Sequence, residues 1–288
     1  MISGIPRVGV SGWTYAPWRG IFYPQGLQRE QELGYAAHHL RTLEINSTFY
    51  GLQRPEAFAT WVEQVPPDFV FAVKAPQLIT HTLRLRDPIV PLANFIASGL
   101  LRLGEHLGPI LWQFPRNFRF DASRIEEFLK LLPHDTRAAA ELGRRHDQSL
   151  RGPAWLDGKS GHRMRHAFEI RHASFRCKAF IDLLQAYDVA LVCADAAGWP
   201  RLMDVTSDFV YCRLHASVET NPDGYGHDAL DAWARRIKAW ANGNEPADAE
   251  RVSGKARSRK RDVFVVFDND VKVRAPGNAM ELIRRLRA

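Results

Sequence analysis

The chain of 288 residues is long enough for one large barrel or two small domains, and its 45% hydrophobic and 25% charged residues are typical of a globular protein. No apolar run approaches the roughly 20 residues that span a bilayer, and residues 1–7 lack the charged head and apolar core of a signal peptide, so we expect a cytoplasmic protein. The formal net charge of +7 suggests a nucleic-acid-binding protein, but removing the six positive charges between Arg251 and Arg261 leaves only +1 for the rest of the chain.

Eight short apolar runs are spread along the chain. Continuous apolar runs of this length are typical of strands that are buried on both faces of a parallel sheet. The predicted strands are Val8–Ser11, Thr42–Asn46, Phe69–Lys74, Ile110–Gln113, Ala167–Ile170, Ala190–Asp195, Phe209–Leu214 and Val263–Phe267.

Stretches with helical periodicity lie between the strands. Pro55 stands at a favoured first helical position, and Asp121 is a predicted helix cap. The predicted helices cover residues 55–64, 91–107, 121–132, 179–187, 229–240 and 276–286, with one more inside 133–166. Eight strands with interleaved helices predict one closed (β/α)8 TIM-type barrel over residues 1–288. An open doubly wound sheet is the alternative, but no GxGxxG turn follows any strand.

Residues 242–261, between the seventh helix and the eighth strand, resemble neither element. From Arg251 to Arg261 they carry six Lys and Arg residues and no acid, together with Gly and Ser. We predict a basic flexible loop, because such charge runs are usually solvated. An arm that binds nucleic acid through its phosphates is the alternative.

Every predicted strand ends in or next to a polar side chain. In a barrel of parallel strands these ends meet at one mouth, where active sites lie. The polar groups are Ser11, Glu44, Asn46, Lys74, Gln113, Glu169, Arg171, Asp195, Arg213, His215, Asp268 and Asn269. Polar groups that are buried unpaired cost free energy, so these must satisfy one another or a ligand. We therefore predict a charge-rich pocket at the mouth.

The cations in this set favour an anionic ligand. Lys74, Arg171 and Arg213 are predicted to bind a phosphate or carboxylate. The predicted general acids or bases are Glu44, Glu169, Asp195 and His215. The residues predicted to orient the ligand by hydrogen bonds or stacking are Asn46, Gln113, Asn269, Trp13 and Tyr50. The set predicts an enzyme of unassigned reaction that acts on a small anionic or phosphorylated substrate, nucleotide-like or sugar-like.

Other interpretations of the same residues stay open. The carboxylates and His215 would suit a divalent metal, although the neighbouring cations would repel it. Two carboxylates would suit glycoside hydrolysis, but the fourth strand ends in Gln113 where an acid would be needed. A buried ion-pair network that closes the barrel top would make the charges purely structural. A non-catalytic protein that binds nucleic acid with the basic loop and the aromatic mouth is the remaining class.

The motifs at the strand ends resemble those of the YecE-like family, known as domain of unknown function seventy-two. In order they are Ser11–Tyr15 with Trp18 and Phe22–Pro24, Glu44–Tyr50, Phe71–Lys74 with Thr80–His81, Gln113–Pro115, Glu169–His172, Tyr211–His215 and Phe267–Asp270. The resemblance implies a TIM-type barrel with a pocket at its C-terminal mouth and supplies no reaction. Its architecture is similar to the metal-dependent barrels of endonuclease IV and xylose isomerase, so a metal-dependent hydrolase or isomerase is an alternative. Ala216 departs from the glycine expected after the histidine, which puts the role of His215 in doubt.

Overall fold

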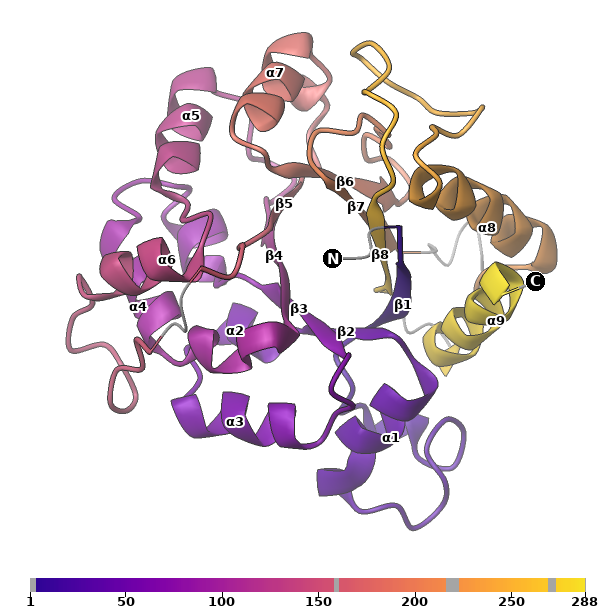
Figure 1. The fold of residues 1–288 in the computed structure, drawn as a ribbon, viewed down its shortest axis with the longest axis horizontal. Helices are drawn as coiled ribbons and strands as arrows, with labels where there is room; N and C mark the ends of the chain where they lie inside the picture. The colour runs from indigo at the N-terminus through magenta and orange to yellow at the C-terminus, as the bar shows by residue number, and fades with distance from the viewer. Residues whose placement is uncertain (1–3, 158–160, 216–222, 269–272, 288) are drawn as a thin grey trace.

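The computed structural model describes residues 4–157, 161–215, 223–268 and 273–287. Within them, eight parallel strands close into a barrel in the order β1 to β8, with β1 hydrogen-bonded to both β2 and β8 (Figure 1). The strands are β1 Pro6–Ser11, β2 Thr42–Ile45, β3 Val70–Lys74, β4 Leu107–Gln113, β5 His166–Glu169, β6 Ala190–Asp195, β7 Phe209–Leu214 and β8 Asp262–Phe267. The predicted (β/α)8 TIM-type barrel is confirmed.

Helices surround the barrel (Figure 1). They are α1 Glu32–His39, α2 Ser47–Tyr50, α3 Pro55–Glu63, α4 Ile89–Ala97, α5 Ala122–Leu131, α6 Thr136–Gly143, α7 Lys178–Ala186, α8 His227–Ala241 and α9 Ala275–Arg287. The Asp121 carboxylate caps α5 by accepting from Arg124 N at 3.2 Å. The helix predicted over 91–107 is divided, because Gly99 has a φ of 117° and separates α4 from a 3-10 segment.

Side chains of the strands alternate between the barrel interior and its outer face. The interior core contains Ala72, Leu111, Ala167, Val192, Tyr211 and Val266. Their strand neighbours, such as Phe71, Trp112 and Phe168, belong to the apolar layer between the barrel and the helices. Because the alternation has a period of two, the next interior position along each strand lies at the mouth.

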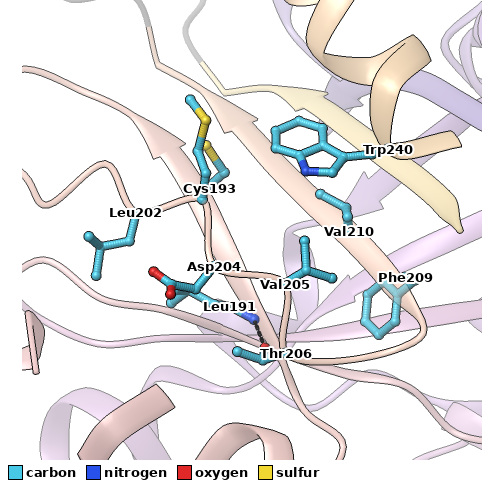
Figure 2. Close-up of a pocket in the computed structure, with 10 residues that line it drawn as sticks. Leu191, Cys193, Leu202, Asp204, Val205, Thr206, Phe209, Val210 and Trp240 are labelled. Carbon is cyan, nitrogen blue, oxygen red and sulfur yellow. Dashed lines mark hydrogen bonds between the residues drawn. The ribbon is translucent and has the colours of Figure 1, made fainter. Parts of the chain in front are cut away.

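The connection between β6 and β7 differs from the expected pattern, because residues 196–208 contain no helix. The Thr206 hydroxyl donates to Val189 O at 2.6 Å and accepts from Leu191 N at 2.8 Å, so it ties this segment to β6. Figure 2 shows Leu202 and Val205 of the segment beside Cys193 and Trp240. Apolar side chains of an irregular segment thus cover the barrel here, around a cavity of about 10 Å³.

The basic loop of residues 242–261 leads from the end of α8 into β8 and packs against the outside of the barrel on the way, since Met203 N donates to Glu250 O and Arg176, shortly after β5, pairs with Glu250. Arg251 pairs with Glu245, and the buried Arg261 guanidinium donates to Arg257 O at 2.6 Å and to Arg259 O at 2.7 Å. Ser253 N donates to Asp204 Oδ1 at 2.8 Å. Part of the basic charge is therefore used in contacts inside the loop, and Ser253 ties the loop to the segment after β6. None of the helices in the described part of the chain has both the length and the apolarity needed to cross a bilayer.

His166, the first residue of β5, makes the stability of the fold depend on pH. Its buried ring accepts from Trp112 Nε1 at Nδ1, over 3.1 Å, and its Nε2 lies 2.8 Å from Pro133 O. Burial lowers the pKa of His166 from 6.5 to about 4. The unfolded chain therefore binds more protons than the folded one between these values, and stability rises with pH through this window.

We expect the wild-type protein to lose about 3 kcal/mol more unfolding free energy than His166→Gln when the pH falls from 7 to 4. Glutamine keeps an acceptor for the Trp112 indole but has no titrating group. Urea denaturation of both proteins at the two pH values measures the difference. Equal losses would show that His166 does not enter the fold as a neutral ring.

Candidate active site

The guanidinium of Arg213, at the end of β7, is the centre of the mouth. It is fully buried and donates to both Glu44 oxygens, from Nη2 to Oε1 at 2.7 Å and from Nε to Oε2 at 3.1 Å. Its Nη1 donates to Glu169 Oε2 at 2.5 Å, and Nη2 lies 2.8 Å from Asp268 Oδ2. Carboxylates from β2, from β5 and from the end of β8 thus surround one cation.

The two glutamates are also held by neutral groups. Glu44 accepts from Ser11 Oγ at 2.6 Å and from the Tyr211 hydroxyl at 2.7 Å. Asn46 Nδ2 in turn donates to Ser11 Oγ at 2.6 Å. On the other side, Gln113 Nε2 donates to Glu169 Oε1 at 2.9 Å. Glu44, Glu169 and Arg213 thus form a buried ion-pair network of the kind that the structural interpretation of the sequence described, and Lys74 forms no ion pair in it among the described residues.

Glu169 stays ionised in this network. Burial alone would raise the pKa of its carboxyl group, but the charge of Arg213, together with His215 and Arg171, lowers that pKa well below 4.5. Arg171 contributes a contact from Nε to Oε1 of 3.0 Å. A carboxyl group with so low a pKa is a poor proton donor at neutral pH.

Lys74, at the end of β3, stands apart from the carboxylates. The Lys74 side chain is 7% exposed, its Nζ lies 4.1 Å from the centre of the Phe49 ring, and within the described residues it forms no ion pair. Burial lowers the pKa of Lys74, and the charge of Arg213 lowers it further. The negative charges of the carboxylates act in the opposite direction and raise it. His81 packs edge-on against Phe49 at 5.2 Å, and burial with the nearby cations lowers its pKa to about 4. The ring of His81 is therefore neutral at physiological pH.

His215, just after β7, lies between two carboxylates. Its Nδ1 is 3.3 Å from Asp268 Oδ2, and its Nε2 is 3.7 Å from Glu169 Oε2, too far for a hydrogen bond. Nε2 is buried and has no hydrogen-bond partner in the described part of the chain. A carboxylate beside one ring nitrogen and a free second nitrogen is the arrangement of an oriented general base.

Trp199 connects this histidine to a cation. Its ring packs edge-on against the His215 ring, with 4.7 Å between centres, and lies 4.1 Å from the Arg171 guanidinium. Arg171 contacts Glu169 alone among the described carboxylates, whereas Arg213 contacts Glu44, Glu169 and Asp268. The charges of Arg171 and Lys74 also act on His81, whose pKa they lower, so the two cations lie near the same histidine.

Asp195 does not join this group. It lies on the outer face of β6, in phase with Leu191 and Cys193, and accepts from Tyr225 OH at 2.9 Å and Trp233 Nε1 at 3.2 Å. The period-two alternation of the strand is the reason, because it turns position 195 toward α8. The prediction that Asp195 reaches the pocket is therefore not met in this structure.

Two further predicted ligand contacts have other positions, and a third falls outside the described residues. The Trp13 ring packs edge-on against Trp61 at 5.7 Å, so it belongs to the apolar layer beside α3. Tyr50 is 74% exposed at the rim. Asn269 lies outside the described residues.

The structure also gives roles to Ser11 and Asp268, which the sequence placed at the mouth without a role, and adds Tyr211 and Trp199 to the site. Tyr211 and Ser11 bind Glu44, and Asp268 contacts Arg213 and His215. All three follow from the period-two alternation, since they share a phase with the interior residues of their strands. The position of Trp199 was harder to predict from the sequence, because this residue lies in an irregular segment whose path no periodicity predicts.

The same geometry bears on metal binding. In the described ranges, no group of three His, Cys, Asp or Glu side chains could hold a metal ion. The space between Glu44, Glu169 and Asp268 is taken by the Arg213 guanidinium. The three carboxylates therefore pair with the guanidinium of Arg213, which is a cation of the chain itself.

Comparisons with known proteins concern a family without an assigned reaction. The family model described as "Protein of unknown function DUF72" matches residues 7–288. UPF0759 protein YecE of Escherichia coli K12 is 32% identical over 121 residues, and the match spans 37% of this chain and 42% of that relative, less than half its length.

Two solved structures share the fold. A DUF72 family protein from Thermotoga maritima MSB8 aligns with a TM-score of 0.69 and 24% identity, over 99% of this chain and 100% of that chain. A DUF72 family protein from Enterococcus faecalis V583 aligns with a TM-score of 0.63 and 16% identity, over 100% of both chains. At these identities the likeness concerns the fold.

Proposed function

The chain belongs to the family of proteins of unknown function DUF72, and we propose that it is an enzyme that performs acid/base chemistry on a small anionic or phosphorylated substrate at the carboxyl end of its barrel. The observation that carries the proposal is His215. Its Nδ1 faces Asp268, and its buried Nε2 has no hydrogen-bond partner among the described residues. Nε2 is therefore free to take a proton from a ligand or to give one.

The proton-transfer role belongs to His215 rather than to the two glutamates. Each Glu44 oxygen already accepts from two groups, counting Ser11, Tyr211 and Arg213. Glu169 is kept ionised, since Arg213 outweighs burial and lowers its pKa. Both carboxylates instead hold Arg213, and Glu169 and Asp268 border the imidazole. Asp268 would orient the ring and stabilise it when protonated.

The anion would bind between Lys74 and Arg171. Lys74 has no ion pair with a described residue, and Arg171 uses Nε on Glu169 while its guanidinium plane packs on Trp199. Arg213 is fully enclosed by carboxylates, so its predicted part in anion binding becomes a positioning one. A nucleotide-like or sugar-like group would lie against the Trp199 ring.

Titration with inorganic phosphate tests the anion site. Lys74→Met should weaken phosphate binding at least about tenfold, because a buried charge-assisted hydrogen bond contributes about 1.5–3 kcal/mol. Lys178→Met is the matched control, since Lys178 lies exposed on α7 and pairs with Asp182. Isothermal titration calorimetry measures both variants. Unchanged affinity in Lys74→Met, or no phosphate binding by the wild-type protein, would refute the proposed site.

A further inference from the structure

A cavity that the charged cluster does not line lies at the same end of the barrel. It has a volume of about 600 Å³, and its walls come from residues that follow β2 and β3 and from α4. Among the described residues, five large hydrophobic side chains are exposed, and three of them line this cavity. They are Tyr50 at 74%, Leu78 at 46% and Val90 at 38% exposure. Exposed apolar side chains that gather in one cavity mark a binding surface.

The backbone beside this cavity is irregular. Residues Leu78–Thr82 form a single π-helical turn. Arg84, Leu85 and Asp87 follow with positive φ angles of 53°, 66° and 43°, which cost free energy in residues with a Cβ atom. Such features cluster at functional sites, where the surrounding structure holds them in place. The wall of the cavity is therefore an independent sign of a binding site.

Phe49 joins the cavity to the anion site. Its ring contacts the Lys74 ammonium at 4.1 Å and also lines the cavity. Pro76 lines the cavity as well, and two residues after Lys74 its Cα is at most about 7.6 Å from the Cα of that lysine. A molecule of modest size can thus reach from the ammonium into the cavity.

We propose that this cavity is the subsite for a flat apolar group of the substrate, so that the substrate class is a small anion that carries an aryl or similar ring. The inference rests on the proposed function, because Lys74 would hold the anionic group of the same molecule. Tyr50, Leu78 and Val90 would contact the ring. Asp87 and Asp147 also line the cavity, so a second anionic group would be repelled there.

The experiment compares 1-naphthyl phosphate with inorganic phosphate by isothermal titration calorimetry. The wild-type protein should bind 1-naphthyl phosphate at least about tenfold more tightly, because the ring buries apolar surface. Leu78→Asp should weaken the binding of 1-naphthyl phosphate far more than that of inorganic phosphate, and so remove this gain, whereas Lys74→Met should weaken the binding of both ligands. Ile21→Asp is the matched control, since Ile21 is 70% exposed on a different cavity of about 610 Å³.

The outcomes separate the two proposals. Equal affinities for the two ligands, or a gain that survives in Leu78→Asp, would overturn the subsite and leave the anion site standing. A gain that is lost in Ile21→Asp instead would also overturn it, by moving the ring to the other cavity. If neither inorganic phosphate nor 1-naphthyl phosphate binds, the proposed function is overturned. If Leu78→Asp fails to fold, Val90→Asp on α4 makes the same test at another residue that lines the cavity.

Discussion

Replacing Arg213 by methionine should lower the free energy of unfolding by about 3–5 kcal/mol at pH 7, because it leaves buried charges without their partner. Glu44 and Glu169 are fully buried, and both depend on this guanidinium, as does the partly exposed Asp268. Arg213→Lys should also be destabilising, since one ammonium group cannot reproduce the paired contacts to Glu44.

The destabilisation caused by Arg213→Met should depend on pH in a defined direction. The pKa of Glu169 is held well below 4.5 in the folded protein, because Arg213 outweighs the effect of burial. A lowered carboxyl pKa stabilises the fold above the unfolded value, and this stabilisation is lost as the pH falls through the folded value. The difference in unfolding free energy between the wild-type protein and Arg213→Met should therefore decrease as the pH drops below about 4.5.

Urea denaturation measures this effect, with Arg144→Met as the control. Arg144 is exposed and pairs with Glu141 at 3.4 Å, so its loss should cost about 0.5 kcal/mol or less. An Arg213→Met variant as stable as this control would show that the carboxylates do not depend on the buried guanidinium.

His215→Asn should reduce turnover about 10²–10⁴-fold and leave the fold intact, because the variant loses the group that transfers the proton. Asparagine is small enough for the site and keeps a donor for Asp268. The assay uses whichever phosphorylated nucleosides or sugars the wild-type protein converts, with product formation as the readout and thermal unfolding as the check on folding.

His172→Asn is the matched control for this variant. His172 also follows a barrel strand, but it is half-buried and its Nδ1 contacts Ser174 Oγ at 2.8 Å. Its loss should leave turnover unchanged. Full activity in His215→Asn would show that another group transfers the proton, and it would refute the proposed role of His215.

Much of the barrel could be predicted from the sequence. Strands buried on both faces leave continuous apolar runs such as Val263–Phe267, and all eight predicted runs overlap observed strands. The helix over 91–107 was extended too far because its apolar stripe continues past Gly99, whose left-handed conformation ends α4. The covering segment after β6 could not be predicted, because it has no regular period.

The membership of the site was easier to predict than the roles of its members. Glu44, Glu169 and Arg213 meet because each stands in the interior phase of its strand, and the same rule excludes Asp195. Whether a charged side chain contacts a ligand or only its neighbours depends on how far it is enclosed. The degree of enclosure depends on how residues from several strands pack together, and the sequence of one strand does not reveal it. For this reason the sequence does not show that Arg213 is enclosed by carboxylates, or that Lys74 has no ion-pair partner among the described residues.

The most direct test of the account is a crystal structure of the protein soaked in tungstate, a tetrahedral phosphate analogue whose anomalous scattering locates it. We predict one anion at the mouth, in contact with the Lys74 ammonium and the Arg171 guanidinium and within hydrogen-bond distance of His215 Nε2. A mouth without tungstate when the anion is saturating, or an anion bound only at the basic loop of residues 242–261, would contradict the account.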